Sequence, residues 1–198
     1  MPFVTILTRV HPARPRCLAR NVASVQAQTD QDLQHLLLRP EIEPHDVIKV
    51  GPLIHLAAPR VEGRYVMQLP DDDRFCSPGF VRDLKAAVGP GEDADMVIFR
   101  MEHGAGPLPP DDKWRIRAVE PGCIAGQNVI VKRAIYAEAS REWLRPIYEA
   151  DFYYIKAALA LSRKVVWWDY VGIASQGMDG CSAGRPESLI ELKPEVER

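Results

Sequence analysis

The sequence lacks the features that mark membrane proteins and disulfide-rich secreted proteins. None of its apolar runs approaches the ~18 residues of a spanning helix, and residues 1–6 carry no basic stretch of the kind that begins a signal peptide. Its four cysteines, Cys17, Cys76, Cys123 and Cys181, are far apart and form no CxxC pair, which is typical of reduced thiols. We therefore expect a cytoplasmic protein with no membrane span.

The chain also lacks an excess of charge of either sign. The chain has 27 acidic and 25 basic residues, a net charge of -2, so no positive field favours nucleic acid as a partner. Its 198 residues are 46% hydrophobic, enough for a substantial core in one domain and cramped for two. We expect residues 1–185 to form that domain and residues 186–198 to be a loosely held polar tail.

Strand and helix patterns alternate along the first half of the chain. Apolar, β-rich runs predict strands at residues 3–8, 36–38, 52–56, 65–69, 96–99, 114–119, 127–131 and 164–168. Helical spacing predicts helices from Pro15 to about residue 28, from Pro78 to Gly89 with Ser77 as the cap, and over residues 150–161. Such alternation favours an α/β fold with a central sheet between helices.

Three adjacent carboxylates, Asp71, Asp72 and Asp73, follow the apolar run at residues 65–69 after a single proline, Pro70. In α/β sheets ligands bind beyond the carboxyl ends of strands, which is where this triplet falls. Carboxylate oxygens on a loop suit Mg²⁺ or Mn²⁺, with a bound phosphate completing the coordination. A solvated acidic turn is the alternative interpretation.

A second acidic pair, Glu149 and Asp151, stands at the start of the last predicted helix. Carboxylates in a first turn are stabilised by the helix dipole, so simple charge compensation explains the pair without any function. The functional interpretation is a general base that takes a proton from an attacking hydroxyl. The spacing alone leaves both open.

Taken together, these features resemble the GT-A glycosyltransferases of the large family 2 group. Residues 3–9 resemble the family's opening strand and nucleotide-binding turn. Residues 18–29 are similar to its L-x-R-x-x-x-S-V-x-x-Q-T helix, and residues 63–73 to its G-x-Y-V-x-x-L-D-x-D strand. Residues 126–133 resemble the acceptor-side strand, and residues 149–152 fall where the family keeps its catalytic "ED" pair. The order of these segments holds over residues 3–172.

The resemblance implies a single GT-A-like, Rossmann-like domain with a mixed central sheet. Residues 1–110 would form its nucleotide-sugar half and residues 111–185 its acceptor half. The implied activity is metal-dependent transfer of a sugar to a carbohydrate or another hydroxyl acceptor, with inversion at the anomeric carbon. The donor would be UDP-, GDP- or dTDP-linked.

The resemblance also implies roles for residues on the donor side. Asp71 and Asp73 would be the outer members of the DXD motif and would hold Mn²⁺ or Mg²⁺, with Asp73 the direct ligand. Thr8, Arg9 and Arg60, together with Asp71 and Asp72, would contact the donor. Asp72 and Asp73 could serve instead as the acidic pair.

On the acceptor side, the resemblance implies that Glu149 activates the acceptor hydroxyl. Asp151 would assist Glu149 or hold the acceptor.

One departure from the family pattern keeps a second function open. Where family members end the second strand with an aspartate that contacts the base, this chain has Arg39 and Pro40. A non-catalytic GT-A-like module that binds a nucleotide or glycan is therefore the alternative. A nucleotidyltransferase would need a glycine-rich phosphate loop after the first strand, and residues 9–16 contain no glycine.

Overall fold

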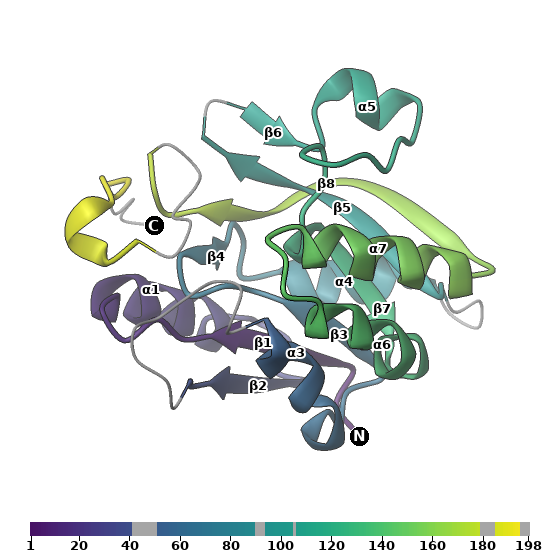
Figure 1. The fold of residues 1–198 in the computed structure, drawn as a ribbon, viewed down its shortest axis with the longest axis horizontal. Coiled ribbons are helices and arrows are strands. Elements are labelled where there is room, and N and C mark those ends of the chain that lie inside the picture. The colour runs from purple at the N-terminus through teal and green to yellow at the C-terminus, as the bar shows by residue number, and fades with distance from the viewer. Residues whose placement is uncertain (41–50, 90–93, 105, 179–184, 195–198) are drawn as a thin grey trace.

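The computed structural model describes residues 1–40, 51–89, 94–104, 106–178 and 185–194, which form one Rossmann-like α/β domain (Figure 1). Their strands are β1 (Val4–Arg9), β2 (Leu33–Leu38), β3 (Tyr65–Gln68), β4 (Asp73–Phe75), β5 (Met96–His103), β6 (Gly106–Leu108), β7 (Val129–Lys132) and β8 (Val165–Ser175). The strands make a mixed sheet in the order β2-β1-β3-β7-β5-β8-β4, and β6 pairs with β5. The predicted fold class is confirmed.

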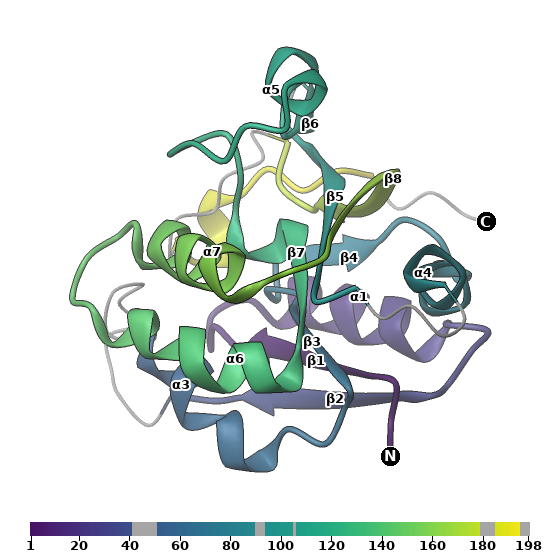
Figure 2. The same ribbon diagram turned by 90° about the vertical axis from the view of Figure 1, so that its right-hand side faces the viewer.

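Helices cover both faces of the sheet (Figure 2). They are α1 (Pro15–Gln26), α3 (Pro52–Leu56), α4 (Phe80–Val88), α5 (Asp111–Arg115), α6 (Arg133–Ala139) and α7 (Ala150–Leu161), with short 3-10 turns η1 (Ala58–Arg60), η2 (Gly126–Asn128), η3 (Ser140–Leu144) and η4 (Glu187–Leu189). Helices α1 and α4 enclose one core, with Phe80 and Leu84 fully buried, whereas α3, α6 and α7 enclose the other around Tyr136 and Ile155. Because both faces are covered, strand residues on either side are buried, which explains the continuous apolar runs.

The sheet brings the ends of several strands to one edge. Strand β1 pairs in parallel with β2 and with β3, so the chain leaves β1 and β3 at the same edge. Strand β7 runs antiparallel to β3, which places η2, immediately before β7, beside the end of β3. We call this the carboxyl edge. It is the edge of an open α/β sheet where ligands bind.

Two of the expected strands do not form. Residues 52–56 form α3, because Pro52 has no N–H to contribute to a sheet but fits the first turn of a helix. Most of the expected strand at residues 114–119 is also wrong. Its start belongs to α5, where Asp111 and Asp112 occupy the first turn and two basic residues the last, as the helix dipole favours.

The three helices that the sequence predicts are present, close to their expected bounds. Helix α7 covers Ala150–Leu161, as predicted. Helix α4 ends at Gly89, whose φ of 82° lies in the left-handed region, but it begins at Phe80 instead of Pro78. The expected capping role of Ser77 is replaced by a turn in which the Gly79 N–H donates to its hydroxyl.

The described part of the C-terminal tail, residues 185–194, is packed against α1 rather than loosely held. Glu187 is buried, and its carboxylate accepts the backbone N–H groups of Arg16 and Cys17 at 2.8 and 2.9 Å. The Arg20 guanidinium donates to the carbonyl of Lys193 at 2.9 Å. Among the described helices, none combines the length and the apolar character needed to cross a membrane.

Candidate active site

The three aspartates lie in a buried loop at the carboxyl edge, which we call the acidic loop (residues 69–73). Asp71 and Asp73 are only 2% and 3% exposed, so a solvated acidic turn does not describe them. The loop is fixed to α1 by Asn21, whose Nδ2 donates to three of its main-chain carbonyls at 2.9–3.2 Å. Asp73 itself begins β4. The acidic loop is therefore a rigid part of the fold.

Arg14, a residue without an expected role, holds two of the carboxylates. Arg14 Nη1 lies 3.1 Å from Asp71 Oδ1 and 3.2 Å from Asp72 Oδ2, and the Arg14 side chain is 6% exposed. The second oxygen of Asp71 accepts the backbone N–H of His11. Both oxygens of Asp71 are thus bound to donors of the protein itself.

Burial shifts the protonation of this loop. Desolvation, together with the neighbouring charge of Asp72, raises the pKa of Asp71 to about 6, and the Arg14 and His11 contacts offset only part of that rise. For the same reasons the pKa of Asp73 lies well above its ordinary value. Asp73 Oδ2 is buried and has no hydrogen-bond partner within the described structure.

Asp71 and Asp73, the expected metal ligands, do not form an open coordination site. Both oxygens of Asp71 are taken, and Asp73 Oδ2 is enclosed by protein. Across the described ranges, no three His, Cys, Asp or Glu side chains are grouped so that they could hold a metal ion. The expected donor set does not fit a resident divalent cation.

Arg9, the last residue of β1, lies between the two groups of acidic residues. Its half-buried guanidinium is attracted by Asp72 and Asp71 on the acidic loop and by Asp151 on α7, while burial lowers its pKa. The guanidinium stands over the ring of Trp143, with Cζ 5.2 Å from the ring centroid. Arg9 therefore joins the donor side of the predicted site to the acceptor side.

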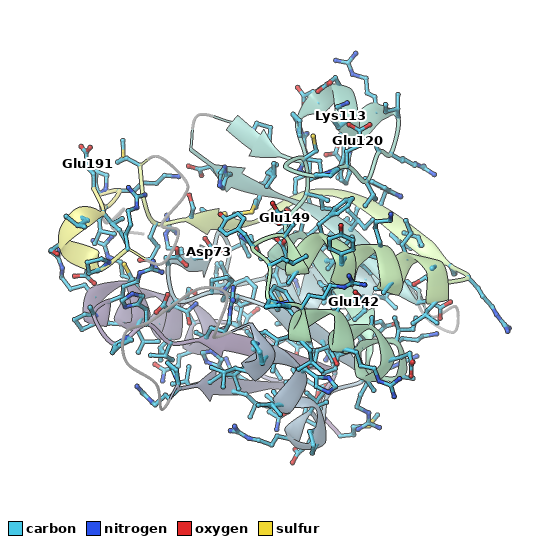
Figure 3. The ribbon with its side chains drawn as sticks, in the orientation of Figure 1. Asp73, Lys113, Glu120, Glu142, Glu149 and Glu191 are labelled. Atoms are coloured by element: carbon cyan, nitrogen blue, oxygen red, sulfur yellow. The ribbon has the colours of Figure 1, made fainter. Side chains whose placement is uncertain are left out.

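The start of α7 presents two carboxylates of different character, Asp151 and Glu149, of which Glu149 is labelled in Figure 3. Asp151 is half-buried, and its carboxylate accepts the N–H groups of Phe152, at 2.8 Å, and of Gly126. Burial raises the pKa of Asp151, and the charge of Arg9 opposes that rise. Glu149 is exposed to solvent at the N-cap of the helix and makes no side-chain capping bond there.

Two other expected donor residues have different surroundings. The buried hydroxyl of Thr8 donates to the carbonyl of Leu69 at 2.8 Å, so Thr8 supports the acidic loop from inside the fold. Arg60 is exposed in η1, and its carbonyl accepts Gln34 Nε2 at 3.0 Å. Arg60 is in η1, which precedes β3, whereas the acidic loop follows β3. The two therefore lie toward opposite ends of this strand.

Three further residues shape the site, although the sequence patterns assign them no role: Arg14, Asn21 and Gln176. Gln176 Nε2 donates to the carbonyls of Cys17 and Asp71 at 2.9 and 3.0 Å and thereby connects β8 to the acidic loop. The position of Arg14 in the polar segment after the first strand is a usable signal, because that segment leaves the carboxyl edge. Asn21 and Gln176 carry no such local signal.

Comparisons with known proteins come from structure alone. No protein-family model matches the sequence, and no curated protein matches it either. S. aureus TarS superposes with a TM-score of 0.66 at 12% identity, over 88% of this chain and 36% of that one. TarS 1-349 in complex with UDP gives a TM-score of 0.64 at 13% identity and covers 88% of this chain and 60% of that one.

A second glycosyltransferase matches over almost its whole length. The enzyme involved in the glycosylation of the major capsid of PBCV-1 gives a TM-score of 0.59 at 13% identity, covering 94% of this chain and 98% of that chain. This chain thus spans less than two thirds of the TarS chains but nearly the full PBCV-1 chain. The fold is that of a GT-A-like glycosyltransferase domain.

Proposed function

We propose that this protein transfers a sugar from a nucleotide-sugar donor to a hydroxyl acceptor. The observation that carries the proposal is the position of Arg9, which interacts with the acidic loop on one side and with Asp151 on the other. A half-buried cation at the carboxyl edge can offset the negative charge that develops on a departing nucleotide diphosphate. The carboxylate on its far side can act on the acceptor.

The acceptor hydroxyl has a high pKa and must lose its proton as it attacks the anomeric carbon. We assign the general base to Asp151, with Glu149, the expected base, as the competing candidate. Asp151 is held by two main-chain N–H groups, and burial raises its pKa toward the range where a carboxylate accepts a proton effectively at neutral pH. Glu149 is exposed at the helix start, without such positioning.

In this proposal the hydroxyl oxygen forms a bond to the anomeric carbon while the bond from that carbon to the diphosphate breaks. The proton passes to Asp151, and the nucleotide diphosphate leaves with the bonding electron pair. Attack from the face opposite the leaving group inverts the anomeric carbon, as expected. Arg9 stabilises the leaving group.

The nature of the donor has support from a structural neighbour, TarS, which has been crystallised with UDP and with UDP-GlcNAc. We extend this to a nucleotide-sugar donor for the present chain and keep UDP, GDP and dTDP as the bases to compare. No step is assigned to a metal ion, since Asp71 and Asp73 do not fit one. A metal requirement is the alternative, and it would appear as loss of nucleotide binding in EDTA.

A non-catalytic module is the rival function, and one assay separates the two. Purified protein is incubated with UDP-, GDP- and dTDP-sugars and a panel of hydroxyl acceptors, and release of the nucleotide diphosphate is measured. We expect one donor to be consumed by the parent and not by Asp151→Asn. Binding of a nucleotide without turnover in any combination would favour the module, and absence of both would contradict the proposal.

A further inference from the structure

We propose that Arg14, in place of a divalent metal, is the resident cation of the acidic loop. In this respect the site would differ from the metal-dependent enzyme that the sequence resembles. The inference concerns the acidic loop itself and rests on the proposed function only where a nucleotide is used as a probe.

The first argument is geometric. A single nitrogen, Arg14 Nη1, contacts oxygens of two carboxylates, at 3.1 Å from Asp71 and 3.2 Å from Asp72. Both distances are those of a charged N–H donating to a carboxylate, so the guanidinium already engages the two side chains that a metal ion would have to bind.

Asp71 and Asp73 are almost wholly enclosed by protein, at 2% and 3% exposed. The other oxygen of Asp71 accepts the backbone N–H of His11. Asp73 Oδ2 has almost no exposed surface, so an ion could not reach it without a rearrangement of the loop. A divalent ion added beside the existing contacts would also lie next to the buried guanidinium, where like charges repel strongly because screening by solvent is weak.

Arg14 is held in place by hydrogen bonds to the C-terminal segment. Its Nε donates to the carbonyl of Arg185 at 2.7 Å, on the C-terminal segment. The same segment holds the preceding residue, because Glu187 N donates to the carbonyl of Ala13 at 2.9 Å. On its other side Arg14 leads directly into α1, whose first N–H groups are bound by the Glu187 carboxylate. The C-terminal segment therefore positions the cation.

The consequence is chemical. A buried arginine is stable only when its charge is paired, and here the pairing partners are the two carboxylates that would otherwise repel a diphosphate. Arg14 thus supplies part of the charge compensation that a metal ion supplies in metal-dependent enzymes, and it does so without a bound ion. Binding of a nucleotide diphosphate should then be insensitive to chelators.

The test measures Mn²⁺ binding directly, by calorimetric titration and by the loss of the free-ion signal in electron paramagnetic resonance. For the parent protein we expect no saturable binding below millimolar Mn²⁺. Arg14→Gln removes the cation and leaves carboxylates unpaired, so this variant should gain Mn²⁺ affinity by at least about tenfold and melt at a higher temperature when Mn²⁺ is present. Arg14→Lys should behave like the parent.

Arg16→Gln is the matched control. Arg16 is the next basic residue along the chain, but its side chain is 71% exposed and pairs with Glu187, outside the acidic loop. It should leave Mn²⁺ binding unchanged. If Arg14→Gln does not fold, the parent titration together with Arg14→Lys still decides.

Saturable micromolar binding of Mn²⁺ by the parent, lost in Asp72→Asn, would overturn the inference. So would nucleotide binding by the parent that is abolished by EDTA and restored by Mn²⁺. If the parent binds no nucleotide under any condition, the proposed function fails, whereas the Mn²⁺ titration still tests the role of Arg14 independently.

Discussion

The two acidic groups at the carboxyl edge differ in what surrounds them. On the acidic loop, Asp71 has both oxygens bound by Arg14 and His11, and Asn21 fixes the backbone. At the start of α7, Glu149 is exposed, and Asp151 accepts only main-chain N–H groups while a cation stands nearby. The first group is balanced inside the fold. The second is the group to which we assign the proposed proton transfer.

The largest expected effect comes from replacing the carboxylates of α7 one at a time. Asp151→Asn keeps the shape of the side chain and removes the proton acceptor, so kcat should fall by about 10²–10⁴-fold, with nucleotide affinity nearly unchanged. Glu149→Gln, at the exposed helix start, should cost less than about threefold, because general-base catalysis is not assigned to it. Release of nucleotide diphosphate and calorimetric titration measure the two effects.

The opposite ranking of these two variants would return the base to Glu149, as the family resemblance implies. Equal activity of both variants and the parent would leave α7 without a catalytic carboxylate.

The burial of Asp71 in the acidic loop should make the free energy of unfolding depend on pH. The pKa of Asp71 is raised to about 6, so the folded state favours its protonated form. The resulting stabilisation is complete below about pH 4 and is lost as the pH rises through about 6, a change of about 3 kcal/mol. Urea unfolding of the parent and of Asp71→Asn from pH 4 to 7 measures it.

The difference in unfolding free energy between parent and Asp71→Asn should fall by that amount across this range. A constant difference would mean that Asp71 titrates normally and that the loop is less enclosed than its 2% exposure indicates.

Arg9 interacts with both acidic groups, so its removal should change the titration of Asp151 and the binding of the diphosphate. Its charge lowers the pKa of Asp151, so Arg9→Gln should move the acid limb of the kcat/KM profile to higher pH. Loss of a charge-assisted contact to the leaving diphosphate should also lower kcat/KM at neutral pH by about 10-fold or more. Arg9→Lys keeps the charge and should restore the acid limb. An unmoved limb in Arg9→Gln would separate Arg9 from Asp151.

How far the sequence can predict this molecule depends on the range of the interactions involved. Strands β1 and β3 are predictable from their apolar, β-rich runs and helix α7 from the helical spacing of its apolar residues, because both are local signals. Residues 52–56 and 114–119 are not predictable in this way, because short segments with neither helical nor strand periodicity fit a strand and a helix equally well. Pro52 favours a helix over residues 52–56, and the placement of charges favours α5 at the start of the second segment, whose residues 116–119 form neither a helix nor a strand.

The residues of the site also fall into those that local sequence identifies and those that only the folded chain brings together. Asp71, Asp72 and Asp151 can be identified from their place at the ends of elements. The pairing of Arg14 with Asp71, 57 residues apart, and of Gln176 with the Asp71 carbonyl, 105 residues apart, depends on the folded chain. A sequence can place a carboxylate at the edge of a sheet, but whether a cation already occupies it is decided by long-range contacts.

The smallest expected effect tests the packing behind Asp151. A Cβ on Gly126 would lie 3.3 Å from Gln68 Nε2, tighter than ordinary contact, and 3.4 Å from both Asp151 Cβ and Trp143 Cζ2, at the limit of ordinary contact. Gly126→Ala should displace these side chains by a few tenths of an ångström. Because catalysis depends on the position of the base, kcat should fall by about two- to fivefold, with the nucleotide dissociation constant unchanged.

Gly106→Ala is the matched control for this change, because no atom lies within 4 Å of a Cβ at Gly106. It should leave kcat at the parental value. If Gly126→Ala lowers nucleotide affinity while kcat is preserved, η2 acts on the donor side of the site. Asp151 would then be a structural anchor of α7, because a displaced base cannot leave the chemical step untouched.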